Sequence, residues 1–179
     1  MRWDKLTVMS QEAFQIAQSK ALELGHQELR PEHLLWSFLT QEGNIVGSLL
    51  AKLEVNSAEL QKEVEKLLKR MPKVQGTGEI YLSSQLNEVM TEAEKEAEKL
   101  KDEYISTEHI FIAMVRLKHL EVSRLLSSFK IEEDALLKAL MDIRGTQRIT
   151  DQEPESKYQA LEKYARDLTA LARQGKLDP

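Results

Sequence analysis

The sequence contains no cysteine, which excludes disulfide bonds, thiol nucleophiles and thiolate metal sites together. Residues that break helices are also scarce, with 7 glycines and 4 prolines among 179 residues. No apolar run approaches the roughly 20 residues that a membrane-spanning helix needs, and the opening MRWDKL contains no apolar signal core. We therefore expect a cytoplasmic protein with no membrane partner.

Positive charge is in deficit, because 25 Lys and Arg residues face 30 Asp and Glu residues, which gives a net charge of -5. A duplex-binding protein needs a concentrated basic face, so nucleic acid is not an expected partner. The phosphate loop GxxxxGK[ST], the nucleophile elbow GxSxG and the zinc motif HExxH do not occur. His33 and His109 lack the neighbouring Cys or His of a zinc site. We expect no catalysis, no metal and no cofactor in this chain.

The residues that are abundant favour helix. Ala, Leu, Glu, Lys and Gln dominate the long uninterrupted stretches, and they lose little side-chain freedom in a helix. Hydrophobic residues make up 41% and charged residues 31%, which is the balance of a soluble globular domain and not of a disordered chain. The sequence therefore predicts an all-α fold.

The chain also repeats itself. Residues 6–67 align without a gap with residues 82–143, at an offset of 76 positions. The identical pairs include Leu6/Leu82, Ala17/Ala93, Glu32/Glu108, His33/His109 and Val46/Val122. Because the matches fall at apolar and turn positions, where a fold constrains sequence, they indicate an internal duplication.

Each repeat is predicted to form four helices. The first begins after Thr7 in one repeat and after Ser83 in the other, since a hydroxyl there can cap free backbone N–H groups. The second begins at Pro31, or after Ser106, and carries the longest apolar run of its repeat. We expect these second helices to be the most buried. The predicted architecture is two four-helix repeats related by pseudo-twofold symmetry, followed by a linker helix.

The repeat domain is expected to span residues 1–145, with repeat one over 1–71 and repeat two over 80–145. From 146 to 157 the chain is polar and without periodicity, which predicts a flexible connector. An amphipathic helix follows, with an apolar face formed by Tyr158, Leu161, Ala165, Leu168 and Ala172. We expect 146–179 to be a linker and helix that lead into a further domain.

A duplicated eight-helix domain with His33 and His109 in its second helices resembles the Clp N-domain of AAA+ unfoldases. The resemblance covers the chain nearly end to end. Its most discriminating part is the tail, YQALEKYARDLT at 158–169 and QGKLDP at 174–179. The opening Leu6-Thr7 and the segment KDEYISTE at 101–108 look more like ClpB than ClpA or ClpC.

The resemblance implies the N-terminal domain and linker of a ClpB-type AAA+ disaggregase chaperone. Such a domain captures unfolded or aggregated polypeptide and passes it to the pore of a homohexamer. The implied partners are the ATPase domains and, indirectly, the DnaK chaperone system, with ATP and Mg bound by the full-length protein alone. The alternative is an N-domain that docks adaptors or phosphoarginine-type degrons for a protease-coupled Clp unfoldase.

The resemblance also implies site residues. Thr7, Asp102 and Glu108 match family positions implicated in substrate handling, and Glu32 and Glu108 match acidic positions that resemble a phosphoarginine site. His109 completes the candidate substrate-binding set. Each residue has a structural alternative: Thr7 as a helix cap, the two glutamates as helix-start acids that complement the dipole, and Asp102 as part of a polar turn.

A peptide groove is expected where the first helices of the two repeats meet, and it needs an apolar floor. Some ClpB relatives carry leucines where this chain has Glu92, Glu96 and His109. We expect the two glutamates on a solvated outer helix face and a more polar, weaker groove. His26 and His119 are expected to be turn residues.

Overall fold

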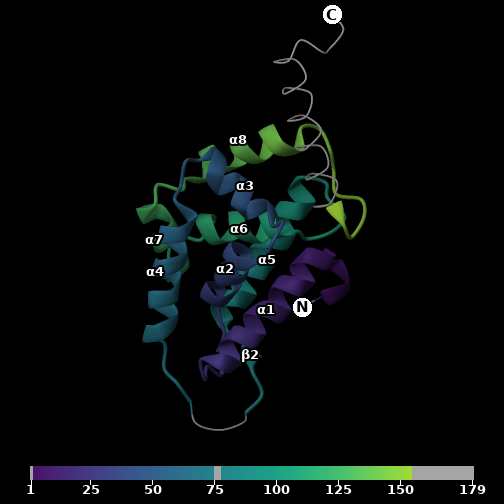
Figure 1. Ribbon diagram of the computed structural model, residues 1–179. Coiled ribbons are helices and arrows are strands. Elements are labelled where there is room, and N and C mark those ends of the chain that lie inside the picture. Colours follow the sequence, from purple (N-terminus) through teal and green to yellow (C-terminus); the bar gives the residue numbers. More distant parts are fainter. Residues whose placement is uncertain (1, 75–77, 155–179) are drawn as a thin grey trace, which may run out of the picture.

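The computed structural model describes residues 2–74 and 78–154. Within these ranges it contains eight α-helices, which Figure 1 labels. They are α1 (Val8–Glu23), α2 (Pro31–Thr40), α3 (Ile45–Lys52), α4 (Ser57–Arg70), α5 (Ser84–Lys99), α6 (Thr107–Arg116), α7 (Glu121–Ser128) and α8 (Glu133–Arg144). A short 3-10 helix, η1 (Trp3–Lys5), precedes α1, and two strands, β1 (Glu28–Leu29) and β2 (Tyr81–Leu82), have two residues each. The helix predicted from Tyr158 lies outside the described residues.

The first helix of each repeat begins where its capping residue predicts. The hydroxyl of Thr7 accepts the amide N–H of Ser10 at 3.2 Å, and α1 follows. The hydroxyl of Ser83 accepts the amide N–H of Leu86 at 3.0 Å, and α5 follows. The predicted starts are confirmed, because the cap depends on chemistry within a few residues.

Backbone pairing shows the predicted pseudo-twofold symmetry directly. Leu29 of β1 pairs in parallel with Leu82 of β2, and Leu6 forms an isolated parallel bridge with Ile105. Leu82 and Ile105 occupy the places of Leu6 and Leu29 in the second repeat, so exchanging the repeats exchanges the two pairings. The sequence analysis missed these strands, because two-residue segments carry no periodic signal.

The core is built around α2 and α6, as predicted. Every side chain from Ile110 to Val115 in α6 is fully buried, and α6 contacts α3, α5, α7 and α8. Phe38 of α2 and Phe111 of α6 are among the largest enclosed side chains. Each such side chain contributes about 1.5–3 kcal/mol through burial.

The chain after α8 departs from the expectation of a flexible connector. Residues 146–153 lie against both repeats in the yellow-green part of Figure 1. Ile149 is fully buried, and its carbonyl accepts the amide N–H of Glu103 at 2.8 Å. The carbonyl of Gln152 accepts the amide N–H of Val8, also at 2.8 Å. The expectation is wrong for this stretch, because one apolar residue among polar ones gives no periodicity and its burial depends on a place formed by distant residues.

Candidate functional site

The structure encloses the five residues predicted to bind substrate. Thr7, Glu108 and His109 are fully buried, whereas Asp102 and Glu32 are each 8% exposed. Asp102 and His109 contact each other across the loop from α5 to α6, and Glu108 lies in the first turn of α6. Glu32 lies in the matching turn of α2. Substrate binding by these residues stays a prediction.

Asp102 is the centre of a buried polar network. Its Oδ2 accepts His109 Nε2 at 2.7 Å, and its Oδ1 accepts Arg144 Nη2 at 2.5 Å and the Ile149 amide at 2.8 Å. The Ser106 amide donates to His109 Nδ1 at 2.9 Å, so Nε2 carries the proton of a neutral imidazole. Burial acts to raise the pKa of Asp102, but these three hydrogen bonds outweigh it and lower the pKa to about 2. The expected polar turn is therefore an enclosed carboxylate that joins four segments of chain.

Repeat one has a histidine pair at the matching place. His33 Nδ1 accepts the Arg30 amide at 2.9 Å, and its Nε2 lies 2.8 Å from Nδ1 of His26. Burial, followed by the charges of His26 and Arg30, lowers the pKa of His33 to about 4. Burial lowers the pKa of His26 as well. His26 lies in a turn as expected, but its side chain is buried and paired because position 26 corresponds to position 102.

A cavity of about 360 Å³ lies where α2, α5 and α7 begin. Glu32 lines it, and within the described part of the chain its Oε2 has no hydrogen-bond partner. Burial, and then the negative charge of Glu121, raise the pKa of Glu32. Arg30, His119 and Arg124 bring positive or polar N–H groups to the same cavity. Glu88 and Glu121 line it too, so the cavity combines carboxylates with groups that attract an anion.

The matching residues in the other half are buried. Thr107 Oγ1 donates to Asn44 Oδ1 at 3.2 Å, and both side chains are buried beside the start of α6. Glu108, which corresponds to Glu32, is fully enclosed. Of the two equivalent glutamates, Glu32 thus lines a cavity and Glu108 is fully buried.

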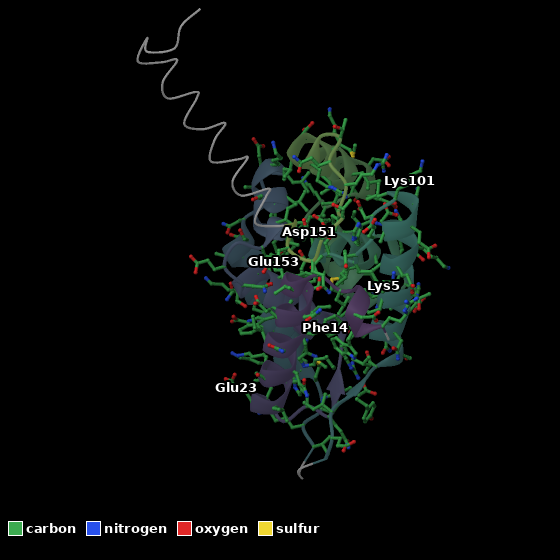
Figure 2. The ribbon with its side chains drawn as sticks, turned by 90° about the vertical axis from the view of Figure 1, so that its right-hand side faces the viewer. Lys5, Phe14, Glu23, Lys101, Asp151 and Glu153 are labelled. Atoms are coloured by element: carbon green, nitrogen blue, oxygen red, sulfur yellow. The ribbon has the colours of Figure 1, made fainter. Side chains whose placement is uncertain are left out.

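An open depression of about 460 Å³ lies against the exposed side of α1. Trp3 is 48% exposed and meets the ring of Phe14 edge to face, with 4.9 Å between ring centroids. Figure 2 faces this side, with Phe14 labelled on α1. Asp4 and the amide side chains of Gln11, Gln15 and Gln18 line the rest. Sequence reasoning missed this feature, although one of only two tryptophans in a polar opening segment was an available signal.

Comparison with known proteins agrees with this duplicated architecture. The family model described as the Clp repeat (R) N-terminal domain matches residues 5–129. The chain belongs to this family. The Clp N-domain expected from the sequence is therefore confirmed.

Individual relatives support the same assignment. This Clp N-domain is 41% identical over 183 residues to the chaperone protein ClpB of Bacillus anthracis, covering 100% of this chain and 21% of that protein. The chain thus spans about a fifth of the length of the curated relatives it matches. The Hsp104 N-terminal domain of Candida albicans matches with a TM-score of 0.74 and 21% identity, over 84% of this chain and 99% of that one. A ClpV N-domain in complex with a VipB peptide matches with a TM-score of 0.64 and 23% identity, over 77% of this chain and 86% of that one. These two structures show a shared fold.

The Clp N-domain has an ion cluster around Glu92 and Glu96. Arg116 of α6 contacts Glu96 at 2.7 Å, Glu92 at 3.3 Å and Glu133 at 2.5 Å. Burial acts to lower the pKa of Arg116, but the carboxylates of Glu133 and Glu96 outweigh it and raise the pKa. The expectation of a solvated face is wrong for Glu96, which is 1% exposed, because Arg116 reaches it from another helix.

Over residues 2–74 and 78–154, no group of three or more His, Cys, Asp or Glu side chains is placed to hold a metal ion. Among the helices that the structure describes, none is long and apolar enough to cross a membrane.

Proposed function

We propose that this Clp N-domain binds unfolded or aggregated polypeptide and delivers it to an ATP-driven hexamer, as part of a disaggregase similar to ClpB. The similarity to ClpB over the entire chain is the observation that carries the proposal. The proposal includes ATPase domains that bind ATP and Mg, cooperation with DnaK, and a cytoplasmic location. A peptide bound to a ClpV N-domain is consistent with a peptide-binding role for this fold.

The depression on α1 is the surface that we assign to the polypeptide. An unfolded chain presents apolar side chains to bury and backbone groups to pair. The Trp3 ring, which packs on the buried Phe14, offers apolar area with little loss of side-chain freedom, and the glutamine amides can both donate and accept. Such a lining selects for exposed unfolded chain and not for one sequence.

The enclosed residues have a supporting role in this proposal. Thr7 caps α1, which forms the wall of the depression, and Asp102 and His109 hold the loop that pairs with the segment before α1. Glu108 lies in the helix turn that follows this loop. These residues would shape the binding surface without touching the polypeptide.

Trp3→Ala is expected to weaken binding of reduced, carboxymethylated lactalbumin about tenfold, because it removes the main aromatic contact. Tyr81→Ala is the matched control, since Tyr81 is also an exposed aromatic side chain (52%) but lies on β2, outside the lining of the depression. An NMR titration of both variants and the unmodified chain measures the effect. Equal affinities for all three, or shifts confined to residues around Asp102 and Glu108, would exclude the α1 surface.

The cavity beside Glu32 favours a second candidate function, the docking of phosphoarginine-tagged protein. A guanidinium needs a carboxylate acceptor, and Glu32 lines this cavity. A phosphate needs cationic groups and helix N-termini, which Arg30, Arg124 and the start of α5 provide. We propose that tagged substrates bind here and not beside Glu108, which is fully buried.

Glu32→Gln is expected to lower the affinity for a phosphoarginine peptide at least about tenfold, because a charge-assisted hydrogen bond is lost. Glu42→Gln, at an exposed glutamate just after α2, should leave it unchanged. Calorimetric titration measures both. Identical affinity in the two variants, or no binding by the unmodified chain, would reject this candidate and leave the α1 surface untouched.

A further inference from the structure

The segment of residues 146–153, here called the exit strap, is held at several points along its length. Arg148 Nη1 donates to the Leu100 carbonyl at 2.7 Å, and the side chain of Ile149 is fully enclosed. Gln152 bonds the opening segment, through its own side chain to the Leu6 carbonyl and through its carbonyl to the Val8 amide. Figure 2 shows Asp151 and Glu153 beyond the start of α1, at the opposite end of that helix from Glu23. The exit strap therefore crosses from repeat two to repeat one.

The path of the exit strap depends on a hydrogen bond to Asp102. This residue offers its Oδ1 to the strap amide of Ile149 and to Arg144, the last residue of α8. Its Oδ2 meets His109 of α6. Hydrogen bonds to an ionised carboxylate are about twice as strong as neutral ones, and this carboxylate is shielded from water. The loop from α5 to α6 and the strap are thus joined by one side chain.

Comparison of the two repeats indicates that this bond is special to repeat two. The chain after α4 follows a similar course, because the Val74 amide donates to the Gly25 carbonyl at 2.9 Å. The charged and apolar groups of the strap are missing there. At the offset of 76 positions, repeat one has His26 where repeat two has Asp102. It likewise has Leu68 in place of Arg144 and Lys73 in place of Ile149. One copy has a carboxylate, its guanidinium partner and an apolar anchor, and the other has none of the three.

We propose that the exit strap is a releasable latch, closed by Asp102, that couples the loop from α5 to α6 to the direction in which the chain leaves the domain. While the latch is closed, the bond from the Val8 amide to the Gln152 carbonyl fixes the path of the exit strap past Val8. The same loop runs from Asp102 to Ser106 and then into α6. A ligand that displaces the loop withdraws the acceptor from Ile149 and leaves the strap held by its other bonds, those of Arg148 and Gln152. The hydrogen bonds of Asp102 and the exit strap carry this inference, which does not depend on the proposed function.

The absence of cysteine makes the latch measurable. Ser19→Cys on α1 and Glu153→Cys at the end of the strap are both exposed, and they give the only two labelling sites for nitroxide spin labels. Pulsed electron resonance then reports the distance between them in the 179-residue chain. We expect a narrow distribution that becomes at least about twofold broader with Asp102→Asn, which weakens the bonds, and with Ile149→Ala, which removes the anchor. Asp142→Asn, an exposed acid on α8, and Val74→Ala, an apolar residue after α4, are the matched controls and should keep the narrow distribution.

Amide hydrogen exchange separates release of the strap from loss of the fold. In both variants the Val8 amide should exchange at least about tenfold faster while the α6 amides keep their protection. Narrow distributions in both variants would overturn the proposal. A second result would also overturn it: Asp102→Asn broadens the distance distribution and speeds exchange throughout α6, whereas Ile149→Ala keeps the narrow distribution. Asp102 would then support only the fold.

Discussion

Arg116→Met is expected to lower the free energy of unfolding by about 3–5 kcal/mol, the range for breaking a buried ion pair from one side. The physical reason is Glu96, whose carboxylate is enclosed and loses its guanidinium partner at 2.7 Å. Glu92 and Glu133 would then repel it as well. Urea denaturation followed by circular dichroism measures the change. Arg124→Met is the control, because Arg124 lies on the neighbouring α7 and its guanidinium donates to the carbonyl of His119.

A double substitution tests the explanation itself. Arg116→Met together with Glu96→Leu replaces the pair with apolar side chains, so it should recover most of the lost stability. A stability of Arg116→Met within about 1 kcal/mol of the unmodified chain would contradict the buried-pair account, because exposed pairs cost that little. Equal loss in the single and double variants would show that packing, and not charge, is responsible.

Acidification from neutral pH to about pH 4 is expected to lower the free energy of unfolding by about 3 kcal/mol through His33 alone. In the unfolded chain this imidazole takes up a proton near its ordinary pKa of 6.5, whereas in the folded chain it does so only at about 4. The unfolded state therefore binds more protons within this window, and stability falls as the pH falls. His26 and His109 act in the same direction, because burial lowers the pKa of each. Glu32 opposes them, since its pKa is raised.

His33→Asn isolates this contribution. Asparagine can accept the Arg30 amide in place of Nδ1 but cannot titrate, so this variant should lose about 3 kcal/mol less between the two pH values. His119→Asn, at an exposed histidine, should keep the full pH dependence. Urea titrations at a series of pH values provide the comparison. An equally steep loss in His33→Asn would mean that the buried pair is not the acid-sensitive element.

The sequence by itself determined the helices and their symmetry. Thr7 and Ser83 placed the helix starts, because a cap bonds an amide only three residues away. The offset of 76 positions predicted the pseudo-twofold axis, since equal patterns of apolar residues fold into equal units. The apolar runs of α2 and α6 predicted the core for the same local reason.

Only the tertiary structure decided which polar residues are enclosed and what they touch. Glu96 is buried because Arg116 lies 20 positions later in the chain, and Asp102 is charged because Arg144 lies 42 positions later. Neither distance has a signature in a sequence, because a charged residue on a helix has the same local pattern whether it meets water or a partner. The burial of Ile149 and Glu108 and the cavity at Glu32 follow from the same cause. Duplication copies local patterns, whereas long-range contacts are where the two copies differ.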